Sequence, residues 1–99
     1  MPLLHLDNQN FEKEIANNEV IVVDFWATWC GPCRMLAPTL EEVSEEGIVV
    51  GKVDVDECPE LANQFGIRSI PTLIVFKNGK KDKVSIGLIT KEQILDLVK

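Results

Sequence analysis

The sequence predicts an α/β fold in which helices cover both faces of a β-sheet. Residues 20–27 form an apolar run that does not alternate with polar residues, as is typical of a strand buried on both faces. A helical pattern and a second apolar strand at residues 48–55 follow, and this order predicts a right-handed βαβ unit with parallel strands. Two further strand-like runs, 73–76 and 83–86, flank Asn78-Gly79, which predicts an antiparallel hairpin.

The segment ahead of the first buried strand contains a helix signal. Phe11 and Ile15 are four residues apart and would share one helix face, and Asn17-Asn18 can end the helix. We expect Asp7 or Asn8 to be the N-cap, because such side chains accept hydrogen bonds from unpaired backbone N–H groups. The order of elements leaves room for a short strand before this helix.

Three more helices are expected along the chain. The one that starts near residue 31 carries Leu36, Leu40 and Val43 on one face and would leave through Gly47. A short helix at residues 59–65 would stop at Gly66. The last one opens with a Thr90 and Gln93 capping box, and its expected buried face consists of Ile94, Leu97 and Val98.

Composition favours one globular domain over residues 1–99, with 45% hydrophobic residues. A net charge of −6 and ten scattered basic residues argue against nucleic acid and against anionic membrane surfaces. The segment Met1–Asp7 has no basic or long apolar stretch, and no run approaches the ~18 apolar residues of a membrane span. Three cysteines, an odd number, fit a reducing compartment, so we expect the protein in the cytoplasm. We also expect a monomer.

The motif Cys30-Gly31-Pro32-Cys33 stands where the first buried strand should turn into a helix. A disulfide across so small a ring would stabilise the fold by only about 2 kcal/mol, so it suits repeated opening better than stapling. At a helix N-terminus, unpaired N–H groups favour a thiolate, which makes Cys30 the expected nucleophile. Cys33, one turn deeper and more shielded, would resolve a mixed disulfide.

Several motifs agree with one known family. The segment 23–33 ends in Trp29-Cys30-Gly31-Pro32-Cys33, and Ile70-Pro71-Thr72 follows at the matching spacing. Further matches are Pro38, Lys52, Asp56, Gly66-Ile67-Arg68, Phe76-Lys77-Asn78-Gly79 and Gly87. From about Phe11 to Val98 the chain resembles the thioredoxin family.

This resemblance implies a thioredoxin fold with a central mixed five-stranded sheet and two helices on each side. It implies a general protein-disulfide reductase that acts on disulfide-containing client proteins and is recharged by a separate thioredoxin reductase. The cofactor expected is none beyond the redox-active Cys30–Cys33 disulfide. The Gly-Pro pair between the cysteines points to the reducing end of the wider superfamily, away from its oxidases, isomerases and glutaredoxins, because no added cation stabilises the thiolate.

Two charged residues are expected to assist the cysteines. Asp24 interrupts the buried run, and the family pattern makes it a proton acceptor and donor for Cys33. The alternative is a solvated Asp24 at a β-bulge. Lys52, in the neighbouring parallel strand, could pair with Asp24 or be an ordinary strand lysine that reaches solvent.

Client binding is expected around the nucleophile. Trp29 would be exposed and cover a docked peptide, whereas Trp26 would pack under the loop. X–Pro bonds are mostly trans, but the resemblance implies a cis Ile70-Pro71 bond beside the cysteines that offers the Ile70 backbone to an extended client segment. The full expected binding set is Trp29, Gly31, Pro32, Ile70, Pro71 and Gly87. Leu88, where the family usually has Ala, would reshape this surface.

Other functions remain open at this stage. Cys30, Cys33, Cys58 and His5 could form a Cys3His zinc site, although the residues are far apart in sequence. The fold could also serve as a binding module with incidental thiols, or as an isomerase-like or glutathione-linked enzyme. Cys58 is interpreted as a small residue near a helix start, with regulatory oxidation or intermolecular pairing as the alternative.

Overall fold

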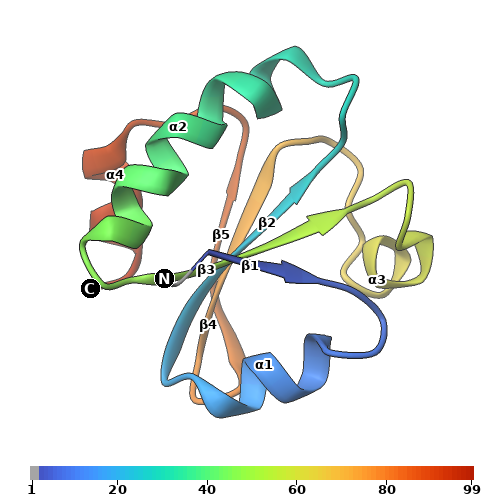
Figure 1. Ribbon diagram of the computed structural model, residues 1–99, viewed down its shortest axis with the longest axis horizontal. Coiled ribbons are helices and arrows are strands. Elements are labelled where there is room, and N and C mark those ends of the chain that lie inside the picture. Colours follow the sequence, from blue (N-terminus) through green and yellow to red (C-terminus); the bar gives the residue numbers. More distant parts are fainter. Residues whose placement is uncertain (1–2) are drawn as a thin grey trace.

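The computed structural model describes residues 3–99 and contains a five-stranded mixed sheet between two pairs of helices (Figure 1). Met1 and Pro2, which belong to the expected domain and N-terminal segment, lie outside the described residues. In chain order the elements are β1 (Leu3–Leu6), α1 (Phe11–Asn17), β2 (Val20–Trp26), α2 (Gly31–Glu45), β3 (Val49–Asp54), α3 (Pro59–Gln64), β4 (Thr72–Lys77), β5 (Lys80–Ile86) and α4 (Lys91–Leu97).

The strands lie in the order β1-β3-β2-β4-β5. β1 and β2 pair in parallel with β3, and β4 pairs antiparallel with both β2 and β5. The βαβ unit, the hairpin and the mixed sheet are thereby confirmed, and the short strand for which the sequence leaves room before the first helix is β1.

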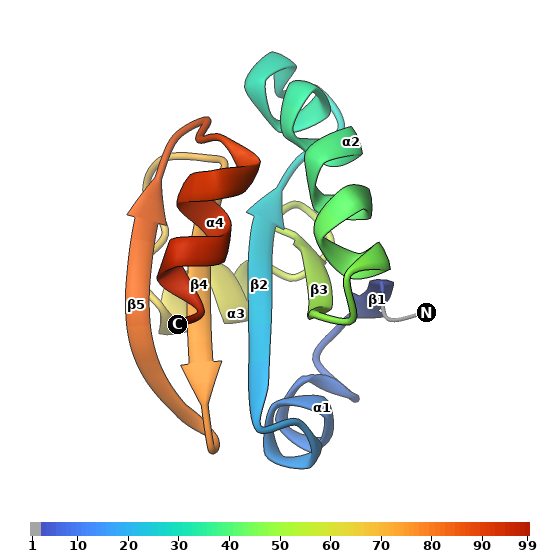
Figure 2. The same cartoon turned by 90° about the vertical axis from the view of Figure 1, so that its left-hand side faces the viewer.

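Helices cover both faces of the sheet, as predicted: α2 and α4 lie on one face and α1 and α3 on the other (Figures 1 and 2). The apolar pattern of β2 is continuous because alternate residues pack against the helices on opposite faces of the sheet. Val22 packs with Leu36 and Leu40 on the α2 side, whereas Val23 packs with Phe11 on the opposite side. Both faces of β2 are therefore buried.

The start of α1 differs from the prediction. Its N-cap is Asn10, whose side chain does not cap the helix. Asp7 Oδ1 instead accepts the N–H groups of Gln9 (2.8 Å) and Asn10 (2.9 Å), and Asn10 Oδ1 accepts the N–H of Asp7 (2.8 Å). Asp7 thus stabilises the turn before the helix, because a hydrogen-bonded Asx turn competes with an earlier helix start.

The hairpin turn is confirmed, and its second strand is longer than predicted. Asn78 and Gly79 have φ values of 53° and 81°, the left-handed conformation that Asn-Gly turns adopt. β5 begins at Lys80 instead of residue 83, and a register shift lies between Val75 and Phe76 of β4. The first residues of β5 are charged, so the sequence gives no strand signal there. An exposed edge strand does not need alternating apolar residues.

Strand directions bring three loops to one end of the sheet. β2 ends at Trp26, shortly before Cys30, and its residue Phe25 pairs with Thr72, the first residue of β4. Because β2 and β4 are antiparallel, the start of β4 lies beside the end of β2. Thr72 also pairs with Ile86, the last residue of β5. The loops that contain Cys30, Pro71 and Gly87 consequently meet.

Candidate active site

Cys30 is the N-cap residue of α2, as predicted from the strand-to-helix junction. Its backbone is extended (φ −90°, ψ 112°), and its Sγ accepts the N–H of Cys33 at 3.2 Å. Pro32 occupies the first turn, where its missing N–H costs no hydrogen bond. The first sulfur therefore lies among the unpaired N–H groups at the positive end of a 15-residue helix.

Cys33 is joined to Cys30 by a disulfide, with 5.2 Å between the Cα atoms. Both residues are buried, with 5% of Cys30 and 2% of Cys33 exposed. The second cysteine is the more shielded of the two, as expected. The pair forms a small cluster with Ala27, against which Trp26 and Ile70 pack.

The loop before β4 approaches the sulfur of Cys30. The Ile70-Pro71 peptide bond is cis, as the resemblance implied. The carbonyl oxygen of Ile70 lies 3.8 Å from Cys30 Sγ. Gly87 donates its N–H to the carbonyl of Pro71 at 2.8 Å and has a φ of 98°, a conformation that favours glycine. One hydrogen bond thus holds two of the three loops together.

Trp29 extends from the loop before Cys30 with 65% of its surface exposed, in agreement with the prediction. Its indole Nε1–H donates to Asp56 Oδ2 at 2.8 Å, and the Asp56 N–H in turn donates to Asp54 Oδ1 at 2.9 Å. The end of β3 therefore orients the ring. Sequence reasoning matched Asp56 to the family pattern but assigned it no contact.

The remaining residues of the expected binding set surround the disulfide. Gly31 and Pro32 are exposed in the first turn of α2, and Leu88 is 45% exposed after Gly87. Trp29, Pro32 and Leu88 thus expose apolar surface on the loops that meet at this end of the sheet, whereas the Cys30 side chain is itself buried. Such an arrangement suits an extended peptide better than a small enclosed substrate.

Asp24 is completely buried, and neither carboxylate oxygen has a hydrogen-bond partner within residues 3–99. β2 pairs without a break on both sides at this residue, with Lys52 in β3 and Leu73 in β4. The solvated-bulge alternative is therefore wrong. Burial raises the pKa of Asp24 to about 7, and the charge of Lys52 partly opposes this rise.

The Asp24 side chain points toward the helix that carries the cysteines. Residues two apart in a strand face the same side of a sheet, and Val22 packs with Leu36 of α2. Asp24 lies nearer than Val22 to the end of β2 that leads to Cys30. A carboxyl group that exchanges its proton near neutral pH is thus placed on the α2 side of the sheet.

Lys52 is the register partner of Asp24, but it forms no ion pair with that residue. Its Nζ lies 4.6 Å from the centroid of the Trp26 ring, a cation–π contact. Lys52 is half-buried and is thus neither the predicted direct partner nor a fully solvated lysine. No pattern along the chain indicates this contact, because it depends on a diagonal between neighbouring strands.

The four residues considered for zinc do not form one cluster in the structure: Cys30 and Cys33 are bonded to each other, and Cys58 belongs to a different cluster. Cys58 is the N-cap of α3 and belongs to the apolar cluster on the α1 and α3 face, which is distinct from the cluster that contains Cys30 and Cys33. Within residues 3–99, no three His, Cys, Asp or Glu side chains are grouped as metal ligands would be. The same residues contain no helix with the length and apolarity needed to cross a bilayer.

Comparison with known proteins assigns the family. The Thioredoxin family model matches residues 2–99. The chain belongs to the thioredoxin family. It is 52% identical over 92 residues to thioredoxin of Alicyclobacillus acidocaldarius, covering 90% of this chain and 88% of that protein. It is 49% identical over 88 residues to thioredoxin 1 of Nostoc sp., covering 85% and 82% of the two chains.

A solved thioredoxin structure shares the fold. A mutant thioredoxin from Halobacterium salinarum superposes with a TM-score of 0.93 at 36% identity and covers 97% of this chain and 87% of that one. Thioredoxins act as disulfide oxidoreductases, and Cys30 and Cys33 provide the dithiol for this exchange. Thioredoxins need no cofactor for this exchange. Members of the family in general act on disulfide substrates and depend on a reductase.

Proposed function

We propose that this thioredoxin is a general, monomeric, single-domain protein-disulfide reductase of the cytoplasm, recharged by a separate thioredoxin reductase. The observation that carries the proposal is the Cys30–Cys33 pair at the N-terminus of α2, with the first sulfur 3.8 Å from the Ile70 carbonyl. The cytoplasm is supported by the free thiol of Cys58, since thiols persist in reducing compartments.

In the first step the reduced protein attacks a client disulfide. The Cys30 thiolate forms a bond to one client sulfur, and the client disulfide bond breaks. The other client sulfur leaves as a thiolate and takes a proton. The N–H of Cys33, which reaches Cys30 Sγ at 3.2 Å, stabilises negative charge on the attacking sulfur.

In the second step Cys33 releases the client. Cys33 loses its proton and attacks Cys30 Sγ, which forms the Cys30–Cys33 disulfide and breaks the bond between Cys30 and the client. The second client sulfur leaves as a thiolate and takes a proton from solvent. Asp24 accepts the proton, because burial raises its pKa to about 7 and so lets it exchange a proton near neutrality. Asp24 later releases its proton to solvent. In total the client gains two electrons from the two cysteines and two protons, and the reductase must return the two electrons to the Cys30–Cys33 disulfide.

Client binding uses the loops around the sulfur. An extended client segment lies along the Ile70-Pro71 backbone, with Gly31, Pro32 and Gly87 leaving room and Trp29 covering it. Lys52 acts as a positioning residue, since it holds the Trp26 ring and its charge opposes the rise in the Asp24 pKa.

Insulin reduction by dithiothreitol, followed by turbidity, tests the proposal. The protein should accelerate precipitation, and Cys30→Ser should lower the rate to that of dithiothreitol alone. Cys58→Ser is the matched control and should retain the full rate, because Cys58 lies in another cluster. Full activity of Cys30→Ser would refute the proposal. An equilibrium with glutathione that is much less reducing would favour an isomerase-like role.

A further inference from the structure

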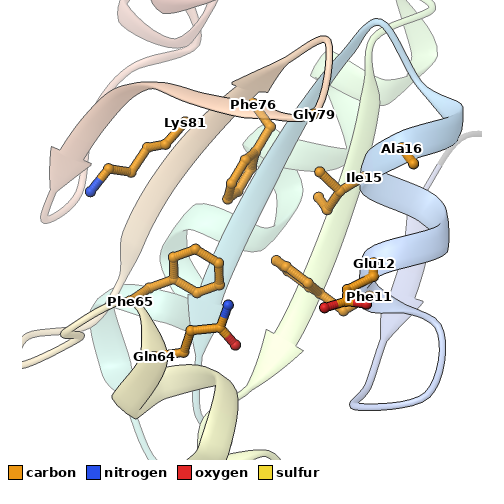
Figure 3. Close-up of a pocket in the computed structure, with 9 residues that line it drawn as sticks. All are labelled: Phe11, Glu12, Ile15, Ala16, Gln64, Phe65, Phe76, Gly79 and Lys81. Carbon is orange, nitrogen blue, oxygen red and sulfur yellow. The ribbon is translucent and has the colours of Figure 1, made fainter.

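A hollow of about 360 Å³ lies on the α1 and α3 face of the sheet, in a part of the molecule that the exchange reaction does not use. Its walls come from α1, the end of α3 and the β4–β5 hairpin (Figure 3). The two helices on this face are short, at seven and six residues, and leave this part of the sheet uncovered. Its size is at the lower end of that of small-molecule sites.

Three phenyl rings form the floor of the hollow. Phe11, Phe65 and Phe76 point toward one another in Figure 3, with ring centroids 5.4 to 5.9 Å apart. Phe11 and Phe76 are buried, whereas Phe65 is half-buried. The Phe65 ring therefore provides most of the apolar surface that a ligand could contact. The rings contact one another, so a ligand would lie on them and not between them. A flat apolar group fits such a floor.

The polar rim is asymmetric in charge. Lys81 pairs in register with Phe76 and lines the hollow, and its side chain extends along the outer edge with the ammonium directed away from Phe11 (Figure 3). The one acid of the hairpin, Asp82, lies 3.6 Å from the ammonium of Lys77 and 3.4 Å from that of Lys83. Within residues 3–99, Lys81 has no ion-pair partner. The hairpin side is therefore positive, in a chain whose net charge is −6.

The opposite side of the rim carries Glu12 of α1 (Figure 3). A ligand anion would be repelled there and attracted to Lys81, so the rim charges select an orientation. The amide of Gln64 at the lower edge adds a neutral donor. From this combination we propose that the hollow is a second binding site, which takes a small aromatic carboxylate with its ring on Phe65 and its carboxylate at Lys81.

The proposal is tested with 3-phenylpropionate as the probe, added to the ¹⁵N-labelled oxidised protein and followed by chemical-shift changes. Saturable shifts are expected for residues 11–16, 64–65 and 76–81, with a dissociation constant of roughly 1–10 mM for so small a ligand in a half-open site. The neutral 3-phenylpropanamide should bind roughly two- to fivefold more weakly, which is the contribution of an exposed ion pair. The cationic 3-phenylpropylamine should bind more weakly still.

Two lysine variants separate the rim from general surface charge. Lys81→Gln should weaken 3-phenylpropionate roughly two- to fivefold, while Lys80→Gln, one residue away but not in the wall, should leave its affinity unchanged. Ala16→Phe, at an exposed helix position in the wall, should block the site. Equal binding of acid and amide, stronger binding of the amine, or unsaturable shifts would each overturn the proposal. Insulin reduction is measured in parallel, and its rate should be unaffected by Lys81→Gln, so the two proposals fail independently.

Discussion

Cys30 and Cys58 occupy similar local positions at the starts of two helices. Each is the N-cap of a helix, and each is followed by a proline within the first two helical positions. Each is also nearly buried, with 5% and 3% exposed. A helix N-terminus and a recessed sulfur are therefore common to both sites, and neither feature distinguishes a redox cysteine from a structural one.

The surroundings of the two sulfurs differ. α2 has 15 residues with no acid in its first turn, and its N-cap sulfur accepts an N–H. α3 has six residues, and Cys58 makes no side-chain cap. Burial, and next the charge of Asp7, raise the pKa of the Cys58 thiol. Glu57 and Asp54 add to that rise.

The comparison teaches that a reactive thiol needs favourable charge around the sulfur and a second sulfur within reach. Cys30 has Cys33 one turn away in the same cluster. Cys58 has apolar neighbours and three carboxylates, which keep it protonated. A protonated, unpartnered thiol does not compete for client disulfides.

The largest expected difference between the two sites is in covalent trapping. Cys33→Ser should accumulate mixed disulfides through Cys30, because the resolving sulfur is gone. In the double variant Cys30→Ser, Cys33→Ser, Cys58 is the sole thiol and should trap nothing. Non-reducing gels with mass spectrometry measure the adducts. Comparable adducts through Cys58 would break the comparison.

The acid near the redox pair should behave differently from the acids near Cys58. Because burial raises the Asp24 pKa from 3.8 to about 7, the unfolded chain loses this proton first as the pH rises. The free energy of unfolding should therefore fall between about pH 4 and pH 7. Asp24→Asn removes the ionisable group and with it the loss of stability. Relative to the wild type, the variant should gain free energy of unfolding as the pH rises from about 4 to about 7, by at most about 4 kcal/mol.

Urea unfolding at several pH values measures this effect. Asp96→Asn, at an exposed position of α4, is the control and should show no such growth. The same Asp24→Asn variant should resolve mixed disulfides more slowly, because Asp24 is the proposed proton acceptor of Cys33. A stability gain that is constant from pH 4 to pH 8 would contradict the buried neutral carboxyl group.

Native protection of Cys58 is the next effect in size. With Cys30 and Cys33 held in their disulfide, iodoacetamide should label Cys58 at least roughly 100-fold more slowly in the folded than in the unfolded protein, because labelling requires local opening. Quenched mass spectrometry gives both rates. Similar rates in the two states would mean that the thiol is accessible and available for regulation.

The smallest expected effect comes from the charges around Cys58. Asp7 is the largest charged contributor to the raised pKa of Cys58, so Asp7→Asn should move the pH dependence of labelling to lower pH. The change in rate should be a few-fold, as for a partly screened charge. Asp7→Asn also alters the Asx turn, so Glu57→Gln, which leaves that turn intact, should shift the profile in the same direction. Unchanged profiles in both variants would leave burial as the sole cause.

Much of the fold was predictable because local patterns agreed with the tertiary structure. The apolar run of β2, the Asn78-Gly79 turn and the Thr90 capping box each determine local geometry. The start of β5 was missed because its lysines and Asp82 lie on an exposed edge. The N-cap of α1 was misplaced because Asp7 forms a turn before the helix.

The site was predictable to a smaller extent. The position of the cysteines followed from the strand-to-helix junction, and the cis Ile70-Pro71 bond followed only from the family resemblance. The Lys52 contact with Trp26 and the Trp29 hydrogen bond to Asp56 depend on neighbouring strands and loops meeting in space. Periodicity along the chain contains no information on such diagonal contacts.

The central claim is that the surroundings of the sulfur, not the helix terminus alone, make Cys30 reactive. The direct measurement is the alkylation rate of each cysteine in the fully reduced protein as a function of pH, resolved by mass spectrometry. Cys30 should reach half of its maximal rate at a lower pH than an ordinary thiol, whose pKa is about 8.5, and Cys58 at a higher pH. Overlapping profiles for Cys30 and Cys58 would contradict the account.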